Sequence, residues 1–160
     1  MQLYFLRHGL ADRSAWSGAD AERPLTEEGA LRMAREAESL ARLGLEPEVI
    51  LTSPLVRARQ TAQIVAERLG LESRVQVDER LAADFGAARL PAMLADHPEA
   101  SSLLLVGHEP SFSETLGELT GGNLVFKKGG LARVDLDLDE PGEPLTGTLV
   151  WLLPPKVLVR

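Results

Sequence analysis

The sequence predicts an α/β fold of three layers, in which a mostly parallel central sheet is flanked by helices and carries an edge hairpin near the C-terminus. Short apolar segments alternate with stretches of helical period up to about residue 120. Beyond residue 130, apolar and charged side chains alternate, as in a half-exposed strand. The length of 160 residues suits one compact domain that spans residues 1–160.

The first predicted strand and helix are joined by a loop. Residues 2–6 form an apolar segment that ends at charged residues, which predicts a short buried strand. Residues 10–25 hold Ser, Gly, Asp and Pro without a period and predict a loop. Thr26 suits a helix N-cap, apolar residues then recur at helical spacing, and Gly44 suits the end of that helix.

A second strand and helix follow in the same order. Residues 48–51 predict a buried strand. Ser53 suits the N-cap of the next helix, Pro54 suits its first position, and Gly70 suits its end. Residues 75–77 predict a third, shorter strand.

A further helix and strand complete the parallel part of the sheet. Residues 88–96 predict a helix, and the continuous apolar run 103–106 predicts a strand that is buried on both faces. A helix that begins at Pro110 or Ser111 is expected to run to about Thr120.

The C-terminal segment predicts a hairpin over residues 131–153. Residues 132–138 alternate between apolar and charged side chains, the turn sequence EPGEP occupies 140–144, and residues 149–153 suit the partner strand. Such a hairpin either provides an edge strand for dimerisation or simply forms the edge of the sheet in a monomer. The sequence therefore does not determine the oligomeric state.

Composition limits the classes of function. The formal net charge is −7, from 24 acidic and 17 basic residues, and no basic stripe is visible, so we expect no nucleic-acid partner. The apolar runs are far shorter than the ~20 residues that span a bilayer, and charge comes too early for a secretory signal. Cysteine is absent, which removes disulfide and thiolate chemistry. We therefore expect a cytoplasmic protein without a membrane partner.

Polar side chains follow three of the predicted strands. In open α/β sheets, ligands bind beyond the carboxyl ends of the strands. Residues 7–9 (RHG) follow the first strand, residues 53–59 (SPLVRAR) the second, and residues 107–110 (GHEP) the fourth. Two of the three histidines of the chain fall in this set, so we expect a site at this edge of the sheet.

These residue types suit phosphoryl chemistry. Neutral imidazole is a nucleophile near neutral pH, and guanidinium groups bind the equatorial oxygens of a transferring phosphoryl group in a bidentate manner. Taken singly, each histidine also suits a hydrogen-bonded loop position and Arg57 a solvated helix face. No pair of histidines has the short helical spacing of common zinc ligands, so we expect no metal.

Together the three segments resemble the histidine phosphatase superfamily, which includes cofactor-dependent phosphoglycerate mutases. Residues 6–9 (LRHG) match its opening signature. Residues 53–62 (SPLVRARQTA) are similar to its second block, S-x-L-x-R-A-x-Q-T-A, and residues 106–109 (VGHE) to its third. The blocks bracket residues 6–109, and the length accounts for nearly the whole chain.

The resemblance implies a role for each matching residue. His8 would be phosphorylated and then freed by water. Arg7, Arg57 and His108 would bind the phosphoryl oxygens and stabilise the transition state. No metal or organic cofactor is implied. We also expect three further residues to contribute to substrate binding: Gly9, Arg23 and Ser53.

Within the superfamily, the short length and residues 23–29 (RPLTEEG) are most similar to SixA-type phosphohistidine phosphatases. Larger members carry an acid in a stretch that resembles L-x-E-x-D-F-G. Here residues 81–86 read LAADFG, so that one residue is missing and alanine occupies the place of the acid. Asp84 or Glu79 is the candidate substitute.

The missing acid favours one class of substrate. Expulsion of an alkoxide needs a general acid, which contributes roughly 10²–10⁴-fold, whereas the imidazole of a phosphohistidine is a far less basic leaving group. We therefore expect a phosphatase acting on phosphohistidine in a protein, such as a histidine phosphotransfer domain. The alternatives are a general phosphomonoesterase for a sugar or nucleotide phosphate, and a phosphate- or phosphoprotein-binding module without turnover.

Overall fold

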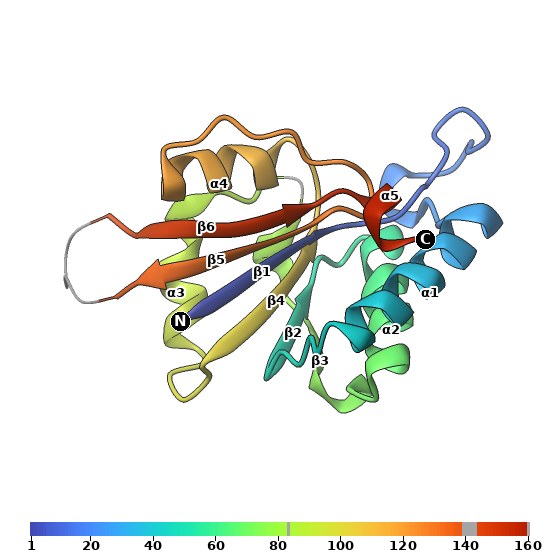
Figure 1. Ribbon diagram of the computed structural model, residues 1–160. Helices are drawn as coiled ribbons and strands as arrows, with labels where there is room; N and C mark the ends of the chain where they lie inside the picture. Colours follow the sequence, from blue (N-terminus) through green and yellow to red (C-terminus); the bar gives the residue numbers. More distant parts are fainter. Residues whose placement is uncertain (83, 139–143, 160) are drawn as a thin grey trace.

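The computed structural model describes residues 1–82, 84–138 and 144–159, and within them a six-stranded sheet lies between helices (Figure 1). The strand order is β3-β2-β4-β1-β5-β6. The four parallel strands are β1 (Gln2–Arg7), β2 (Val49–Thr52), β3 (Val75–Val77) and β4 (Ser102–Gly107). The antiparallel strands at one edge are β5 (Leu131–Asp137) and β6 (Thr146–Leu153). The predicted α/β class and edge hairpin are confirmed, although most of the predicted turn at 140–144 lies outside the described residues.

Helices cover both faces of the sheet. On one face lie α1 (Glu27–Arg42), α2 (Val56–Leu69) and the short α5 (Pro155–Leu158), and on the other lie α3 (Leu90–Ala95) and α4 (Ser111–Thr120) (Figure 1). Successive side chains of a strand point to opposite faces, so β1, β2 and β4 each contribute to two cores. This explains why β4 is buried along its whole length.

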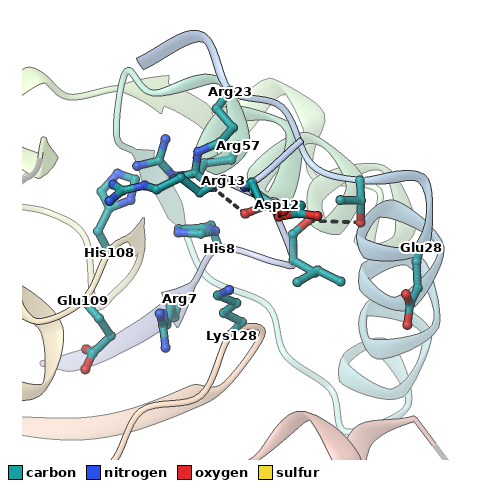
Figure 2. A pocket seen from close by; sticks show the side chains of 14 residues that line it. Arg7, His8, Asp12, Arg13, Arg23, Glu28, Arg57, His108, Glu109 and Lys128 are labelled. Atoms are coloured by element: carbon teal, nitrogen blue, oxygen red, sulfur yellow. Dashed lines mark hydrogen bonds between the residues drawn. The ribbon is translucent and has the colours of Figure 1, made fainter. Parts of the chain in front are cut away.

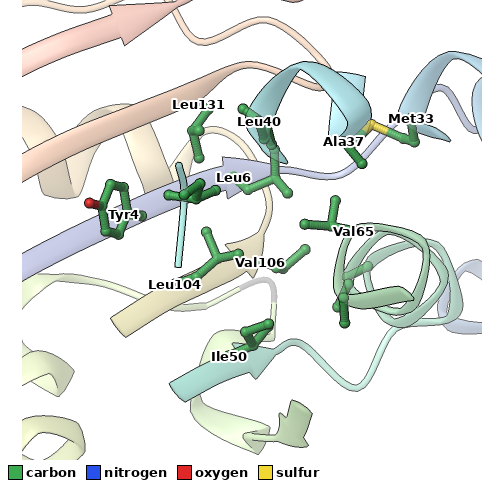
Figure 3. Close-up of a cluster of buried hydrophobic side chains, with 14 of the residues drawn as sticks. Tyr4, Leu6, Met33, Ala37, Leu40, Ile50, Val65, Leu104, Val106 and Leu131 are labelled. Atoms are coloured by element: carbon green, nitrogen blue, oxygen red, sulfur yellow. The ribbon is translucent and has the colours of Figure 1, made fainter. Parts of the chain in front are cut away.

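The core under α1 and α2 is aliphatic (Figure 3). Met33, Ala37 and Leu40 from α1 and Val65 from α2 pack against one face of the strands. The strand residues on that face include Tyr4, Leu6, Ile50, Leu104, Val106 and Leu131. This packing fixes α2, and therefore Arg57 in its first turn, relative to the ends of β1 and β4.

The opposite core is built around an aromatic side chain of α4. The fully buried Phe112 ring makes edge-to-face contacts with Phe5, Phe85 and Phe126, at centroid distances of 5.1, 5.9 and 6.1 Å. Such pairs contribute about 0.5–1.5 kcal/mol each beyond their buried area. Because the Phe112 N–H donates to the His108 carbonyl (3.1 Å), the cluster anchors the segment that carries His108.

The predicted helix ends are partly correct. The Thr26 side chain accepts the Gly29 N–H (2.9 Å) at the N-cap of α1, as predicted, and Gly70 ends α2 in the left-handed conformation (φ 69°). The predicted start of α2 is wrong. The helix begins at Val56, because Ser53 Oγ accepts the Leu55 N–H (3.2 Å) within a turn that precedes the helix.

Short elements that the sequence patterns did not reveal connect the main ones. Within the described ranges, four 3₁₀ helices lie at Asp20–Glu22 (η1), Glu72–Arg74 (η2), Glu79–Leu81 (η3) and Ala87–Arg89 (η4). The first of them lies in the predicted loop 10–25, and the last runs into α3, so that the predicted helix 88–96 is divided in two. Among the described residues, no helix is both long and apolar enough to cross a membrane.

Candidate active site

The parallel pairing of β1 with β4 brings two histidines together. The register aligns Arg7 with Gly107, and the His8 N–H donates to the Gly107 carbonyl (3.0 Å). The imidazole rings of His8 and His108, the next residues in each segment, are 5.2 Å apart between centroids. The segment after β2 joins the same edge, because the Ser53 N–H donates to the Val106 carbonyl (3.0 Å).

A cavity of about 690 Å³ opens at this edge of the sheet (Figure 2). Its lining includes Arg7, His8, Arg57 and His108, the four residues that the sequence places in the catalytic set, together with Arg23. Figure 2 shows the His8 ring between the side chains of Arg57 and Lys128. Residues from the ends of β1 and β4, from helix α2 and from the connecting loops therefore line one cavity with His8.

The hydrogen bonds of His8 leave one ring nitrogen free. Nδ1 lies 2.7 Å from the Gly9 carbonyl oxygen and therefore carries the proton, which leaves a lone pair on Nε2. Burial, together with the nearby His108, Arg57 and Arg7, lowers the pKa of His8 to about 3, although its bond to Gly9 opposes this. His8 is neutral at physiological pH, the state that a nucleophilic imidazole requires.

Three buried N–H groups near His8 have no hydrogen-bond partner among the described residues. They belong to Arg7 Nε, Arg57 Nε and His108 Nδ1. A buried donor without an acceptor costs about 1–3 kcal/mol, so groups of this kind favour an incoming anion. A phosphoryl group held by these donors would face the free nitrogen of His8.

The tautomer of His108 follows from its partner. His108 Nε2 lies 2.7 Å from Ser53 Oγ, which already accepts the Leu55 N–H. When the Ser53 hydroxyl donates its proton to Nε2, the ring proton of His108 lies on Nδ1. Burial and the nearby Arg57 lower the pKa of His108 to about 4, so this ring is also neutral before an anion binds.

Each arginine of the site is fixed by its outer nitrogens. Arg7 Nη1 donates to the Phe126 carbonyl (2.8 Å). Arg57 Nη1 donates to the Asp20 carbonyl (2.8 Å), and Nη2 donates to Asp20 Oδ2 (3.1 Å). Burial lowers the pKa of both guanidinium groups, but arginine remains charged in proteins. Both arginines thus keep their Nε–H for a ligand.

The three predicted substrate-binding residues occupy different positions. Arg23 lines the cavity, but its guanidinium donates to Asp20 Oδ1 and to the Ala11 carbonyl. Gly9 lies behind His8, where a Cβ would come within 2.7 Å of Met33 Cγ, and it supplies the carbonyl that orients the ring. Ser53 is fully buried and contacts His108.

Neither candidate acid lies in the cavity. The carboxylate of Asp84 is 71% exposed and pairs with Arg89 (2.5 Å), and Glu79 does not line the cavity. Ala83, between them, lies outside the described residues. Glu79 lies in η3 and Asp84 between η3 and η4, and neither residue is part of the cavity lining that contains His8.

Three other carboxylates line the cavity: Asp12, Glu28 and Glu109. Asp12 Oδ1 accepts the N–H (2.9 Å) and the hydroxyl (2.8 Å) of Ser14, and Glu109 Oε1 accepts the Ser113 N–H (2.8 Å). Sequence reasoning missed them, although Glu109 directly follows His108. No group of three or more His, Asp or Glu side chains suited to a metal ion occurs among the described residues.

Comparisons with known proteins identify the family to which the chain is similar. The model of the histidine phosphatase superfamily (branch 1) matches residues 3–119. The chain is 40% identical to an uncharacterized protein of Picosynechococcus sp. over 96% of this chain and 100% of the relative. It is 30% identical to the phosphohistidine phosphatase SixA of Escherichia coli over 97% of this chain and 94% of the relative.

Solved structures show the same fold. The structure of the protein histidine phosphatase SixA in complex with tungstate matches with a TM-score of 0.85 at 31% identity, over 99% of both chains. A mycobacterial glucosyl-3-phosphoglycerate phosphatase matches with a TM-score of 0.72 at 24% identity, over 94% of this chain and 98% of the other. The second match shows a shared fold alone.

Proposed function

The chain belongs to branch 1 of the histidine phosphatase superfamily, and on that premise we propose that it removes phosphate from phosphohistidine in a protein. Family membership and the similarity to SixA support a phosphohydrolase. One observation carries the proposal further. His8, with its free Nε2, lines one cavity with Arg7, Arg57 and His108, each of which has a buried nitrogen without a described hydrogen-bond partner.

The reaction proceeds in two displacements at phosphorus. His8 Nε2 forms a bond to phosphorus while the P–N bond to the imidazole of the substrate breaks, and the departing imidazole takes a proton from water. The hydroxide left by this proton transfer regains a proton from a second water molecule as that molecule attacks phosphorus. The P–N bond to His8 breaks, and inorganic phosphate leaves. The enzyme ends in its starting state, and the net reaction consumes one water molecule.

The surrounding groups stabilise the charge of the transferring group. Arg7 Nε, Arg57 Nε and His108 Nδ1 bind the equatorial oxygens, over which the negative charge of the transition state spreads. They are fixed before substrate binds by bonds to Phe126, Asp20 and Ser53, so little reorganisation is needed.

The carboxylates of the cavity support a substrate with a good leaving group. Asp12 and Glu109 each accept a hydrogen bond from a backbone N–H, and Oε1 of Glu28 lies 3.8 Å from Nη1 of Arg32. Each carboxylate is therefore engaged as a hydrogen-bond acceptor or as the counter-charge of an arginine. None is held as a proton donor toward a leaving oxygen. Phosphohistidine needs less protonation of its leaving group than an alkyl phosphate does. We propose that the phosphohistidine is carried by a histidine phosphotransfer domain.

A direct comparison of substrates tests this proposal. The purified protein is assayed at neutral pH on a phosphohistidine-bearing protein or peptide and on sugar and nucleotide monophosphates. We expect a strong preference for phosphohistidine, its loss in His8→Ala, and its retention in His97→Ala, the histidine outside the cavity. Comparable turnover of esters would support the general phosphomonoesterase instead, and a wild type that binds phosphate without turnover would support a binding module.

A further inference from the structure

Asp20 is the shared counter-charge of two buried arginines. It lies in η1, within the loop between β1 and α1. Its Oδ1 accepts from Arg23 Nε (3.3 Å) and Nη2 (3.2 Å), and its Oδ2 accepts from Arg57 Nη2 (3.1 Å). The side chains of Arg23 and Arg57 are 8% and 7% exposed, whereas that of Asp20 is 50% exposed. A more exposed contact joins the same carboxylate to Arg13 (3.4 Å).

The contact with Arg57 fixes the rotation of its guanidinium group. Asp20 accepts from both terminal nitrogens of Arg57, through its carbonyl oxygen (2.8 Å) and through Oδ2. The Nε–H of Arg57, a residue that lines the cavity, is buried and has no hydrogen-bond partner among the described residues. A guanidinium held at both terminal nitrogens cannot turn about its last bond without breaking one of these contacts.

We propose that Asp20 is a positioning residue, which holds Arg57 so that its Nε–H faces a phosphoryl group on His8. This role concerns the anion site itself. Its consequence for turnover rests on the proposed function, but its consequence for anion binding does not. Asp20 contributes no atom to the reaction.

The charge of Asp20 and its positioning role predict opposite effects of its removal on phosphate binding. Burial opposes its ionisation, but Arg57 and Arg23 together outweigh this and hold the pKa of Asp20 below its ordinary value. A carboxylate so close to an anion site repels the anion. If charge alone mattered, neutralising Asp20 would strengthen phosphate binding. If Asp20 instead positions Arg57, its neutralisation would misplace the guanidinium group and weaken phosphate binding.

The experiment measures inorganic phosphate binding by calorimetry in the wild type and in Asp20→Asn. We expect Asp20→Asn to weaken binding about tenfold, because misplacement of a charged donor by about 1 Å has effects of this size or larger. The matched control is Glu22→Gln, which removes a carboxylate from the same 3₁₀ helix and for which no ion pair is recorded among the described residues. It should change binding less than twofold. Unchanged or tighter binding by Asp20→Asn would overturn the proposal.

A double-mutant comparison shows whether Asp20 acts through Arg57. In an Arg57→Lys background, which has no planar guanidinium to orient, Asp20→Asn should change phosphate binding less than twofold. An unchanged tenfold effect would mean that Asp20 acts elsewhere and would overturn the assignment. If Asp20→Asn fails to fold, Asp20→Glu retains the charge but moves the carboxylate by one methylene. It should weaken binding about threefold, and wild-type binding by it would contradict the proposal.

Kinetics separates the two proposals. On phosphohistidine, Asp20→Asn should lower kcat more than it raises KM, because the contacts of Arg57 strengthen as charge develops on the phosphoryl oxygens. A rise in KM with an unaltered kcat would contradict this role. A wild type without turnover would remove the proposed function, while the binding experiment would still decide the role of Asp20.

Discussion

The Ser53 hydroxyl lies 2.7 Å from Nε2 of His108, a residue 55 positions further along the chain. Both side chains are buried, with exposures of 0% for Ser53 and 5% for His108. The contact joins the segment after β2 to the segment after β4, and Nδ1 of His108 is buried without a hydrogen-bond partner among the described residues. We infer that Ser53 holds the ring of His108 in the orientation that leaves Nδ1 free for a ligand.

Ser53→Ala should impair turnover without unfolding the protein. The substitution leaves Nε2 of His108 without its partner, which costs about 1–3 kcal/mol, and frees the ring to rotate or to change its tautomer. We expect kcat/KM to fall about tenfold, measured on phosphohistidine with circular dichroism as a check on folding. Ser113→Ala, which removes a hydroxyl bonded to the Pro110 carbonyl, is the matched control. Equal activity of the two variants would contradict the role of Ser53.

Arg57→Lys should be severely impaired. An ammonium is a point charge and cannot both contact Asp20 and present an Nε–H to the phosphoryl group. We expect kcat/KM to fall about 100-fold, which corresponds to about 2.7 kcal/mol of transition-state stabilisation. Arg59→Lys, on the exposed face of the same helix, should retain the wild-type rate. Wild-type turnover in Arg57→Lys would exclude a bidentate role for Arg57.

The two histidines of the cavity should titrate far below ordinary imidazoles. The pKa of His8 is lowered to about 3 and that of His108 to about 4, chiefly by burial, so both rings should be neutral at pH 6 in the free protein. Saturating phosphate should raise both pKa values, because an anion favours the charged imidazolium. Imidazole ¹⁵N chemical shifts measure both effects, and the His97 signals should not respond to phosphate. Titration of His8 near 6.5 in the free protein would contradict the prediction.

Glu36→Gln should stabilise the protein at alkaline pH. Glu36 lies on α1, is 2% exposed, and its Oε2 has no hydrogen-bond partner among the described residues. Burial raises the pKa of its carboxyl from 4.5 to about 8, although Arg32 opposes the shift. Between these pH values the folded state holds a proton that the unfolded state has lost, so the free energy of unfolding falls as pH rises through this window.

Urea unfolding at pH 5 and at pH 8.5 measures this effect. Glu36→Gln should exceed the wild type by roughly 2 to 4 kcal/mol at pH 8.5 and by little at pH 5. Glu38→Gln, which removes an exposed carboxylate from the same helix, should change stability by less than about 1 kcal/mol at both values. A stability difference between Glu36→Gln and the wild type that does not depend on pH would contradict the buried, protonated state of Glu36.

The architecture could be predicted because its signals are local. Strands β1, β2 and β4 are short apolar runs, each followed by polar residues, and the carboxyl ends of parallel strands meet at one edge of a sheet. The N-cap of Thr26 and the left-handed Gly70 depend on a few neighbouring residues. The start of α2 was predicted incorrectly because the Ser53 side chain satisfies a local N–H and a distant histidine together.

The sequence by itself therefore determined which residues gather at the edge of the sheet: Arg7, His8, Arg57 and His108. The tertiary structure alone decided how they are held. Asp20 contacts Arg57 across 37 positions from a loop without any period, and Asp84 lies outside the cavity beside Arg89. Local patterns encode helix caps and strand ends, whereas such contacts depend on how the loops cross the finished sheet. The orientation of each donor toward His8 is consequently a property of the folded protein.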